Sequence, residues 1–188
     1  AAGLLNPTIG GKSVFPYQPE GLWKVNGANY VQDKGENLYR RSMYTIWKRS
    51  VHHPTLSIFD APDHSFSVSK RQETNTPLQA LVLMNDPTFV EASKVLGEKM
   101  LDNPEISKSI EDTFRRLTGR KPNPKELQIL IELRENEYRK FKSDQNKTKG
   151  WLASGEYQIP PELDLFHLAA NAVTASAIIN SDAFLTKR

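Results

Sequence analysis

The residues best suited to chemistry gather in one polar segment between positions 52 and 73. Its candidate side chains are His52, His53, Asp60, Asp63, His64, Arg71 and Glu73. Imidazole titrates near neutral pH, and both imidazole and carboxylate groups bind metal ions. The segment is therefore suited to proton transfer or to metal binding on an irregular loop.

Two interpretations of this segment compete. The spacing matches no defined metal-ligand motif such as the helical His-Glu-x-x-His, so we predict no metal site. Asp60 before Ala-Pro can form a turn through its side chain, and His53 before Pro54 can be a rigid corner. We favour a buried, hydrogen-bonded loop. A functional pocket without metal stays open, and its catalytic candidates are His53, Asp60, Asp63, Arg71 and Glu73.

A second group of candidates surrounds a predicted helix start. Thr74, Asn75 and Thr76 precede Gln79, and the free backbone N–H groups of a helix N-terminus attract anions. Arg71 would add a bidentate partner for such an anion. Thr76 and Gln79 also fit a capping box, in which each side chain bonds the other residue's backbone N–H. We favour the capping box, which leaves Thr74 and Asn75 as the ligand-binding candidates.

A third group is aromatic, because exposed rings can stack on sugars. Its members are Tyr17, Trp23, Tyr30, Trp47 and Trp151. Trp47 stands at helical spacing from other apolar residues, which favours a place in the core. Trp23 and Trp151 stand in polar, irregular surroundings and remain candidates for ligand binding, with carbohydrate as a possible partner.

Composition narrows the class of protein. The 188 residues fit one domain, and the 25 basic and 22 acidic residues leave a net charge of +3. The basic residues come as scattered pairs, whereas nucleic-acid binding needs them clustered on one face, so we predict no nucleic-acid partner. No cysteine occurs, which excludes disulfides, thiolate metal sites and a covalently held c-type haem in this chain. No apolar run has the length of a membrane span.

The elements that must position these residues are predominantly helical. Four predicted helices begin with a capping residue followed by proline, at Thr76, Asp86, Asn103 and Asn123. Gly119 is suited to end the third of them in a left-handed conformation. An apolar stripe predicts another helix over 38–50. Residues 160–179 are apolar nearly all round, which predicts the most buried helix of a bundle, followed by a final turn at 183–185.

The remaining segments are predicted to be irregular. They are 1–37, 51–75 and 143–158. The aromatic residues within 1–37 argue against disorder and predict an ordered arm that lies along other structure. We therefore predict an all-α fold: an irregular bundle of about six helices with a long extended N-terminal arm. The arm covers 1–37 and the helical domain 38–188, as a single domain overall. Residues 1–5 suggest the tail of a helix belonging to a longer protein.

Several runs, in order and spacing, resemble one bacterial family. They are Gly-Lys-Ser-Val-Phe-Pro-Tyr-Gln-Pro at 11–19, Arg-Ser-Met-Tyr-Thr-Ile-Trp-Lys-Arg at 41–49, Phe-Asp-Ala-Pro at 59–62, Thr-Asn-Thr-Pro-Leu-Gln-Ala-Leu at 74–81, Asn-Asp-Pro at 85–87 and Asn-Ser-Asp-Ala-Phe-Leu at 180–185. The family is domain of unknown function 1553, found at the C-terminus of large planctomycete-type proteins, often with cytochrome c-like domains upstream. The chain resembles the C-terminal part of that domain.

The resemblance implies export to the periplasm or beyond, upstream domains of the same protein as partners, and a link to polysaccharide utilisation. Any haem would be carried by those upstream domains, since we expect no cofactor in this chain. Our leading hypothesis is a helical module that acts in assembly or substrate presentation. The alternative is part of a hydrolytic or cytochrome-linked redox enzyme whose active site upstream domains complete.

Overall fold

The fold is all-α, as predicted. The computed structural model describes residues 1–24, 27 and 29–186, and this part of the chain contains eight α-helices and no β-strand. Six of the helices have eight or more residues, which agrees with the predicted bundle of about six. Contacts group the chain into two compact units, residues 4–82 and residues 1–3 with 83–188. The expected boundary after residue 37 and the single domain stay predictions.

In the first unit, residues 6–14 of the N-terminal arm pair with the segment around residues 39–46. The Asn6 amide donates to the Tyr39 carbonyl at 2.9 Å. Val14 donates to the Tyr44 carbonyl at 2.8 Å and accepts from the Ile46 amide at 2.9 Å. Val14 and Leu38 are buried. The arm is therefore ordered because its backbone bonds another segment of the unit.

The predicted helix over 38–50 is wrong. Two short 3-10 helices, η2 (Gly35–Tyr39) and η3 (Ser42–Tyr44), replace it. An α-helix would bond each amide to the carbonyl four residues earlier, but Val14 already takes the Ile46 amide and the Tyr44 carbonyl. Met43, part of the apolar stripe, is 77% exposed. The helical spacing of the apolar residues is therefore coincidental. Backbone pairing with the arm determines the structure of this segment.

Two α-helices follow in this part of the chain. They are α1 (Pro54–Ile58) and α2 (Pro77–Asn85). The first lies in a segment that was predicted to be irregular. The second begins with the predicted capping box: Thr76 N–H donates to Gln79 Oε1 at 3.1 Å, and Gln79 N–H donates to Thr76 Oγ1 at 3.3 Å.

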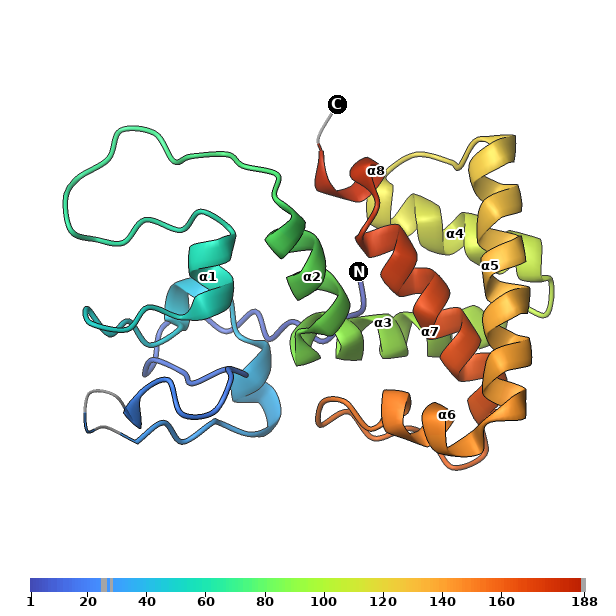
Figure 1. Cartoon of the computed structure of the whole chain (residues 1–188), viewed down its shortest axis with the longest axis horizontal. Coiled ribbons are helices and arrows are strands. Elements are labelled where there is room, and N and C mark those ends of the chain that lie inside the picture. Colours follow the sequence, from blue (N-terminus) through green and yellow to red (C-terminus); the bar gives the residue numbers. More distant parts are fainter. Residues whose placement is uncertain (25–26, 28, 187–188) are drawn as a thin grey trace. The chain divides into compact units, whose positions relative to one another are not determined.

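The second unit is a helical bundle around one buried helix (Figure 1). Its elements are α3 (Pro87–Lys99), η4 (Met100–Asp102), α4 (Ile106–Thr118), α5 (Pro124–Ser143), α6 (Gln145–Leu152), α7 (Leu165–Ile179) and α8 (Asp182–Leu185). Helix α7 packs against α3 and α5 and has ten buried residues. The prediction that the last long helix is the most buried is confirmed, and α8 is the predicted final turn.

Local capping explains where several of these helices begin and end. Asp86 accepts the Thr88 amide at 2.9 Å at the start of α3. Asn123 and Glu126 form the predicted capping box of α5, with both bonds at 2.8 Å. Gly119 ends α4 with φ 78°, the left-handed conformation that glycine adopts without strain. These predictions needed only neighbouring residues.

Two helix starts and one predicted helix tail differ from the structure. The Asn103 side chain accepts the Glu105 amide at 3.0 Å in a turn, and α4 begins only at Ile106. The last long helix begins at Leu165 rather than after Pro160, because Asp164 caps it by accepting the amides of the second and third helical residues. Residues 1–5 are not helical.

Helix α6 lies in a segment that was predicted to be a loop. The Asp144 carboxylate caps it by accepting the Lys147 amide at 2.9 Å. Only Thr148 and Leu152, four residues apart, are buried. The segment therefore has no apolar stripe from which a helix could be predicted. Thr148 Oγ1 donates to the Phe141 carbonyl at 2.9 Å, which joins the start of α6 to the end of α5.

A polar network joins the three central helices of the bundle. Arg134 of α5 is 4% exposed, and its Nε donates to Asn171 Oδ1 of α7 at 3.1 Å. Asn171 Nδ2 donates to the carbonyl of Gly97 of α3 at 3.3 Å. His167 Nδ1 accepts from the Arg134 guanidinium at 2.6 Å. Buried polar groups are thus satisfied across the helices. None of the described helices has the length and apolarity to cross a membrane.

Candidate functional site

Three residues join the two ends of the stretch 61–73, and we call them the latch: Asp60, Thr74 and Gln79. Asp60 Oδ2 accepts both the backbone N–H and the hydroxyl of Thr74, each at 2.8 Å. Thr74 Oγ1 in turn accepts from Gln79 Nε2 at 3.1 Å. The same amide donates to the carbonyl of Ile58 at 2.9 Å. The latch closes residues 61–73 into a loop.

The charge of Asp60 is stabilised by these contacts. Its pKa is lowered, first by the backbone N–H of Thr74 and then by the Thr74 hydroxyl, with a smaller contribution from the Arg71 charge. Asp60 has φ 59°, a left-handed conformation in which aspartate is one of the tolerated residues. The chain therefore turns at Asp60, and the carboxylate of the same residue accepts hydrogen bonds from Thr74 at the other end of the loop.

Arg71 adds a second closing contact to the loop. One of its guanidinium nitrogens donates to the Phe59 carbonyl at 3.1 Å. Glu73 and Asn75, the neighbouring candidates, are exposed. The polar residues of this run thus divide between loop closure, helix capping and solvent.

A second cluster forms around Trp47. His52 stacks on its indole with centroids 4.7 Å apart, and His64 meets the ring edge-on at 4.5 Å. Asp63 accepts the Ser65 amide at 2.9 Å. Its pKa is lowered mainly by that N–H, and more weakly by the charges of His52 and His64. Trp47 is thus a platform for two imidazoles rather than part of a helix core.

His53 lies apart from this cluster. It is buried, and its Nε2 is 2.9 Å from the carbonyl of Tyr17 in the N-terminal arm. The predicted catalytic residues therefore have separate partners. His53 contacts the N-terminal arm, Asp60 accepts from Thr74, and Arg71 donates to the Phe59 carbonyl. Within the described residues, no three histidine, aspartate or glutamate side chains are grouped closely enough to hold a metal ion.

The two candidate tryptophans lie in different surroundings. Trp23 meets Phe15 and Tyr30 edge-on at 5.9 and 5.1 Å, and the Lys48 ammonium lies 4.6 Å from its ring centroid. It lines a pocket of about 390 Å³. Trp151 belongs to α6 instead and packs, partly buried, against the cluster around Phe141. The first is accessible to a ligand, whereas the second is largely engaged in packing.

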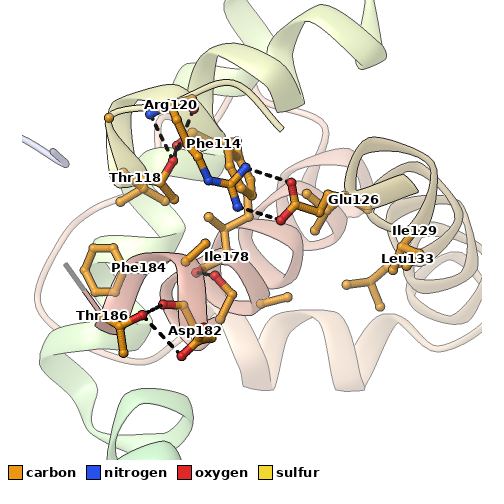
Figure 2. A pocket seen from close by; sticks show the side chains of 16 residues that line it. Phe114, Thr118, Arg120, Glu126, Ile129, Leu133, Ile178, Asp182, Phe184 and Thr186 are labelled. Carbon is orange, nitrogen blue, oxygen red and sulfur yellow. Dashed lines mark hydrogen bonds and ion pairs between the residues drawn. The ribbon is translucent and has the colours of Figure 1, made fainter. Parts of the chain in front are cut away.

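The helical unit carries a larger groove that sequence reasoning missed (Figure 2). It has a volume of about 980 Å³ and is lined from α4, α5, α7 and α8. Ile129 and Leu133, four residues apart on α5, line it, whereas Leu127 and Ile131 of the same helix pack against the core. A helix face that packs against the core accounts for one row of apolar residues. The second row was therefore the sequence feature that could have predicted the groove.

An ion pair stands beside this groove. Arg120 donates to both carboxylate oxygens of Glu126, at 2.8 and 2.6 Å, and Figure 2 shows the two side chains facing each other. The Arg120 hydrogen bonds are the main reason that the pKa of Glu126 falls to about 2, and the Asn123 N–H adds to the effect. Glu126 thus pairs with Arg120 at the groove and also caps the start of α5.

Glu126→Gln should lower the free energy of unfolding by about 1 kcal/mol at neutral pH, because it removes the ion pair and keeps a capping side chain. A carboxylate whose folded pKa lies below its unfolded value stabilises the fold above the unfolded pKa. The wild-type advantage should therefore shrink as pH falls from about 4.5 towards 2. Denaturant unfolding across this range measures it.

The matched control is Glu162→Gln, which removes an exposed carboxylate before α7. It should leave the pH dependence unchanged. A gap between wild type and Glu126→Gln that stays constant from pH 7 to pH 2 would contradict the ion-pair geometry.

A protein-family model matches more than half of the chain. The family model described as "PSD1: Protein of unknown function (DUF1553)" matches residues 1–134. No curated protein and no solved structure matches the chain. The matched residues include the latch, the Trp47 cluster and the Trp23 pocket.

Proposed function

The chain belongs to the PSD1 family of proteins of unknown function (DUF1553), and on this premise we propose that it is a helical module that presents the loop 61–73 to other parts of a larger protein. The latch joins the two ends of the loop, and most residues of the loop are exposed to solvent. The partner in this proposal is the upstream part of the same polypeptide, which the family resemblance implies.

The latch is the observation that carries the proposal. Asp60 accepts both donors of Thr74, and the Thr74 hydroxyl accepts from Gln79. A catalytic carboxylate must direct a lone pair or a proton at its substrate. Here the polar groups of Asp60, Thr74 and Gln79 bond one another and close a loop. Binding residues are often found on loops that a rigid scaffold positions.

The loop has a surface suited to recognition. Phe66 is 70% exposed and Val68 is 46% exposed. Lys70 and Arg71 follow them and are also exposed. Aromatic residues and arginine are enriched at protein interfaces, and a preformed loop loses little conformational entropy on binding. The matching partner surface would have an apolar pocket with acidic groups around it.

The alternative is an enzyme, hydrolytic or cytochrome-linked, completed by upstream domains that carry any haem. It needs His53, Asp60 and Arg71 to act together on one substrate. Each of them instead makes a separate internal hydrogen bond. This separation favours the presenting module.

The proposal also includes export to the periplasm or the cell exterior and a link to polysaccharide utilisation, with carbohydrate as a second partner. Support for these parts comes only from the resemblance of the runs at 41–49, 59–62 and 74–81 to the family. A reporter fusion of the full-length protein, assayed for its compartment, tests the export step separately.

Isothermal titration of the 188-residue chain against the separately produced upstream part of its protein tests the main proposal. Replacing Phe66 and Val68 with serine should weaken the affinity about tenfold or more, because the apolar contact is lost. Ile9→Ser is the matched control, since Ile9 is 85% exposed elsewhere in the same unit. It should bind as the wild type does.

Two results would count against the module. One is equal affinity of the loop variant and the wild type. The other is turnover of a sulfated or acidic glycan by the isolated chain, which would make it an enzyme in its own right.

A further inference from the structure

We propose that the pocket beside Trp23 binds a neutral sugar residue of a glycan. The inference rests on the carbohydrate part of the proposed function and names the class of sugar, and it is argued from the side chains of this pocket. Residues 18–21, 23–24 and 29–32 line the pocket, which lies outside the loop 61–73. Its volume of about 390 Å³ is at the lower end of the range for small-molecule sites.

The pocket wall combines rings with amides. Trp23 and Tyr30 supply aromatic surface, against which the apolar C–H face of a pyranose can pack. Gln18, Asn29 and Gln32 supply side-chain amides. An amide both donates and accepts hydrogen bonds, as a sugar hydroxyl does, so each pairs with the other in either direction.

These amides are available to a ligand. Asn29 and Gln32 are exposed, and Gln18 is half-buried. The two charged residues of the wall, Glu20 and Lys24, have opposite signs. The wall therefore carries no net charge, which favours a neutral sugar over a uronic acid or a sulfated unit.

The aromatic part of the wall is preformed. Phe15 and Tyr30 hold Trp23 edge-on, with interplanar angles of 65° and 77°. The Tyr30 hydroxyl donates to the Pro16 carbonyl, and burial raises the pKa of this phenol. Rings that are already placed lose little entropy when a sugar binds, so even a small contact area gives measurable affinity.

Lys48 contributes from beside the pocket. Its ammonium lies 4.6 Å from the Trp23 ring centroid and is buried, with no hydrogen-bond partner among the described residues. A cation over an indole face anchors the ring through its quadrupole. Lys48 is therefore a positioning residue for Trp23 and does not itself line the pocket.

Titration of the whole 188-residue chain with neutral hexasaccharides of glucose, mannose, galactose and xylose, followed by calorimetry, tests the proposal. At least one should bind, and Gln18→Ala with Gln32→Ala should weaken that binding about tenfold or more. This variant leaves the ring cluster intact. Trp23→Leu should abolish binding, and circular dichroism shows whether either variant still folds.

Trp151→Phe is the matched control, since Trp151 packs in the helical unit. It should leave sugar affinity unchanged. Binding of none of the four neutral sugars, unchanged affinity in the amide variant, or tighter binding of a hexauronate or of adenosine would each overturn the proposal. Such a failure leaves the loop-binding experiment untouched, so the two ideas fail separately.

Discussion

Gly97→Ala is expected to lower the free energy of unfolding by about 3 kcal/mol, because the added methyl group overpacks a helix crossing. Gly97 of α3 lies where α3 and α7 cross. A Cβ atom there would be 2.6 Å from the backbone nitrogen of Ala172 and 2.8 Å from its Cα. These are backbone atoms of the most buried helix, so the clash is relieved only by moving the helices apart.

The matched control is Gly150→Ala in α6, where an added Cβ meets nothing within 4 Å. It should stabilise the fold by about 0.5–1 kcal/mol, because alanine is the better helix former. Chemical denaturation measures both variants. A neutral Gly97→Ala would mean that α3 and α7 do not approach this closely.

Lys94→Met is expected to cost about 3–5 kcal/mol, because it breaks a buried charge assembly. Lys94 is 2% exposed. Its ammonium donates to three carbonyls, of Leu152, Ser154 and Tyr157, at 3.2, 2.8 and 3.0 Å. Methionine has a similar shape but no donor, so three carbonyl groups lose a charged partner.

Glu91 deepens this effect. It is 0% exposed, and it accepts the Tyr157 amide. Burial lowers the pKa of Lys94, and the Glu91 charge partly restores it. Without the ammonium, the carboxylate is left buried with less compensation.

Lys99→Met, on the same helix but exposed, is the control for Lys94→Met and should change stability by about 0.5 kcal/mol or less. Thermal unfolding of the two variants compares them directly. Equal and small losses of stability for both variants would contradict the three hydrogen bonds from the Lys94 ammonium to carbonyl groups.

The sequence predicted what depends on neighbouring residues. The caps at Thr76, Asp86 and Asn123 are local chemistry, and the structure contains each of them. The helix over 38–50 failed because Val14, far away in the sequence, takes its backbone bonds. Helix α6 was missed because only two of its residues are buried.

The candidate site shows the same limit. The sequence singled out Asp60, Thr74 and Gln79, but assigned them to different interpretations, since nothing local shows that Asp60 reaches a residue fourteen positions later. The carbonyls around Lys94 lie some sixty residues away, so its burial was equally invisible. Long-range partners decide which polar residues are structural.

The role proposed for the latch is to present the loop. Its most direct test is the dissociation constant between the upstream part of the protein and the Thr74→Val variant, whose valine keeps the shape and removes the hydroxyl. We expect affinity about tenfold weaker than wild type, with faster hydrogen exchange confined to residues 61–73. Wild-type affinity in a variant whose loop exchanges faster would contradict it.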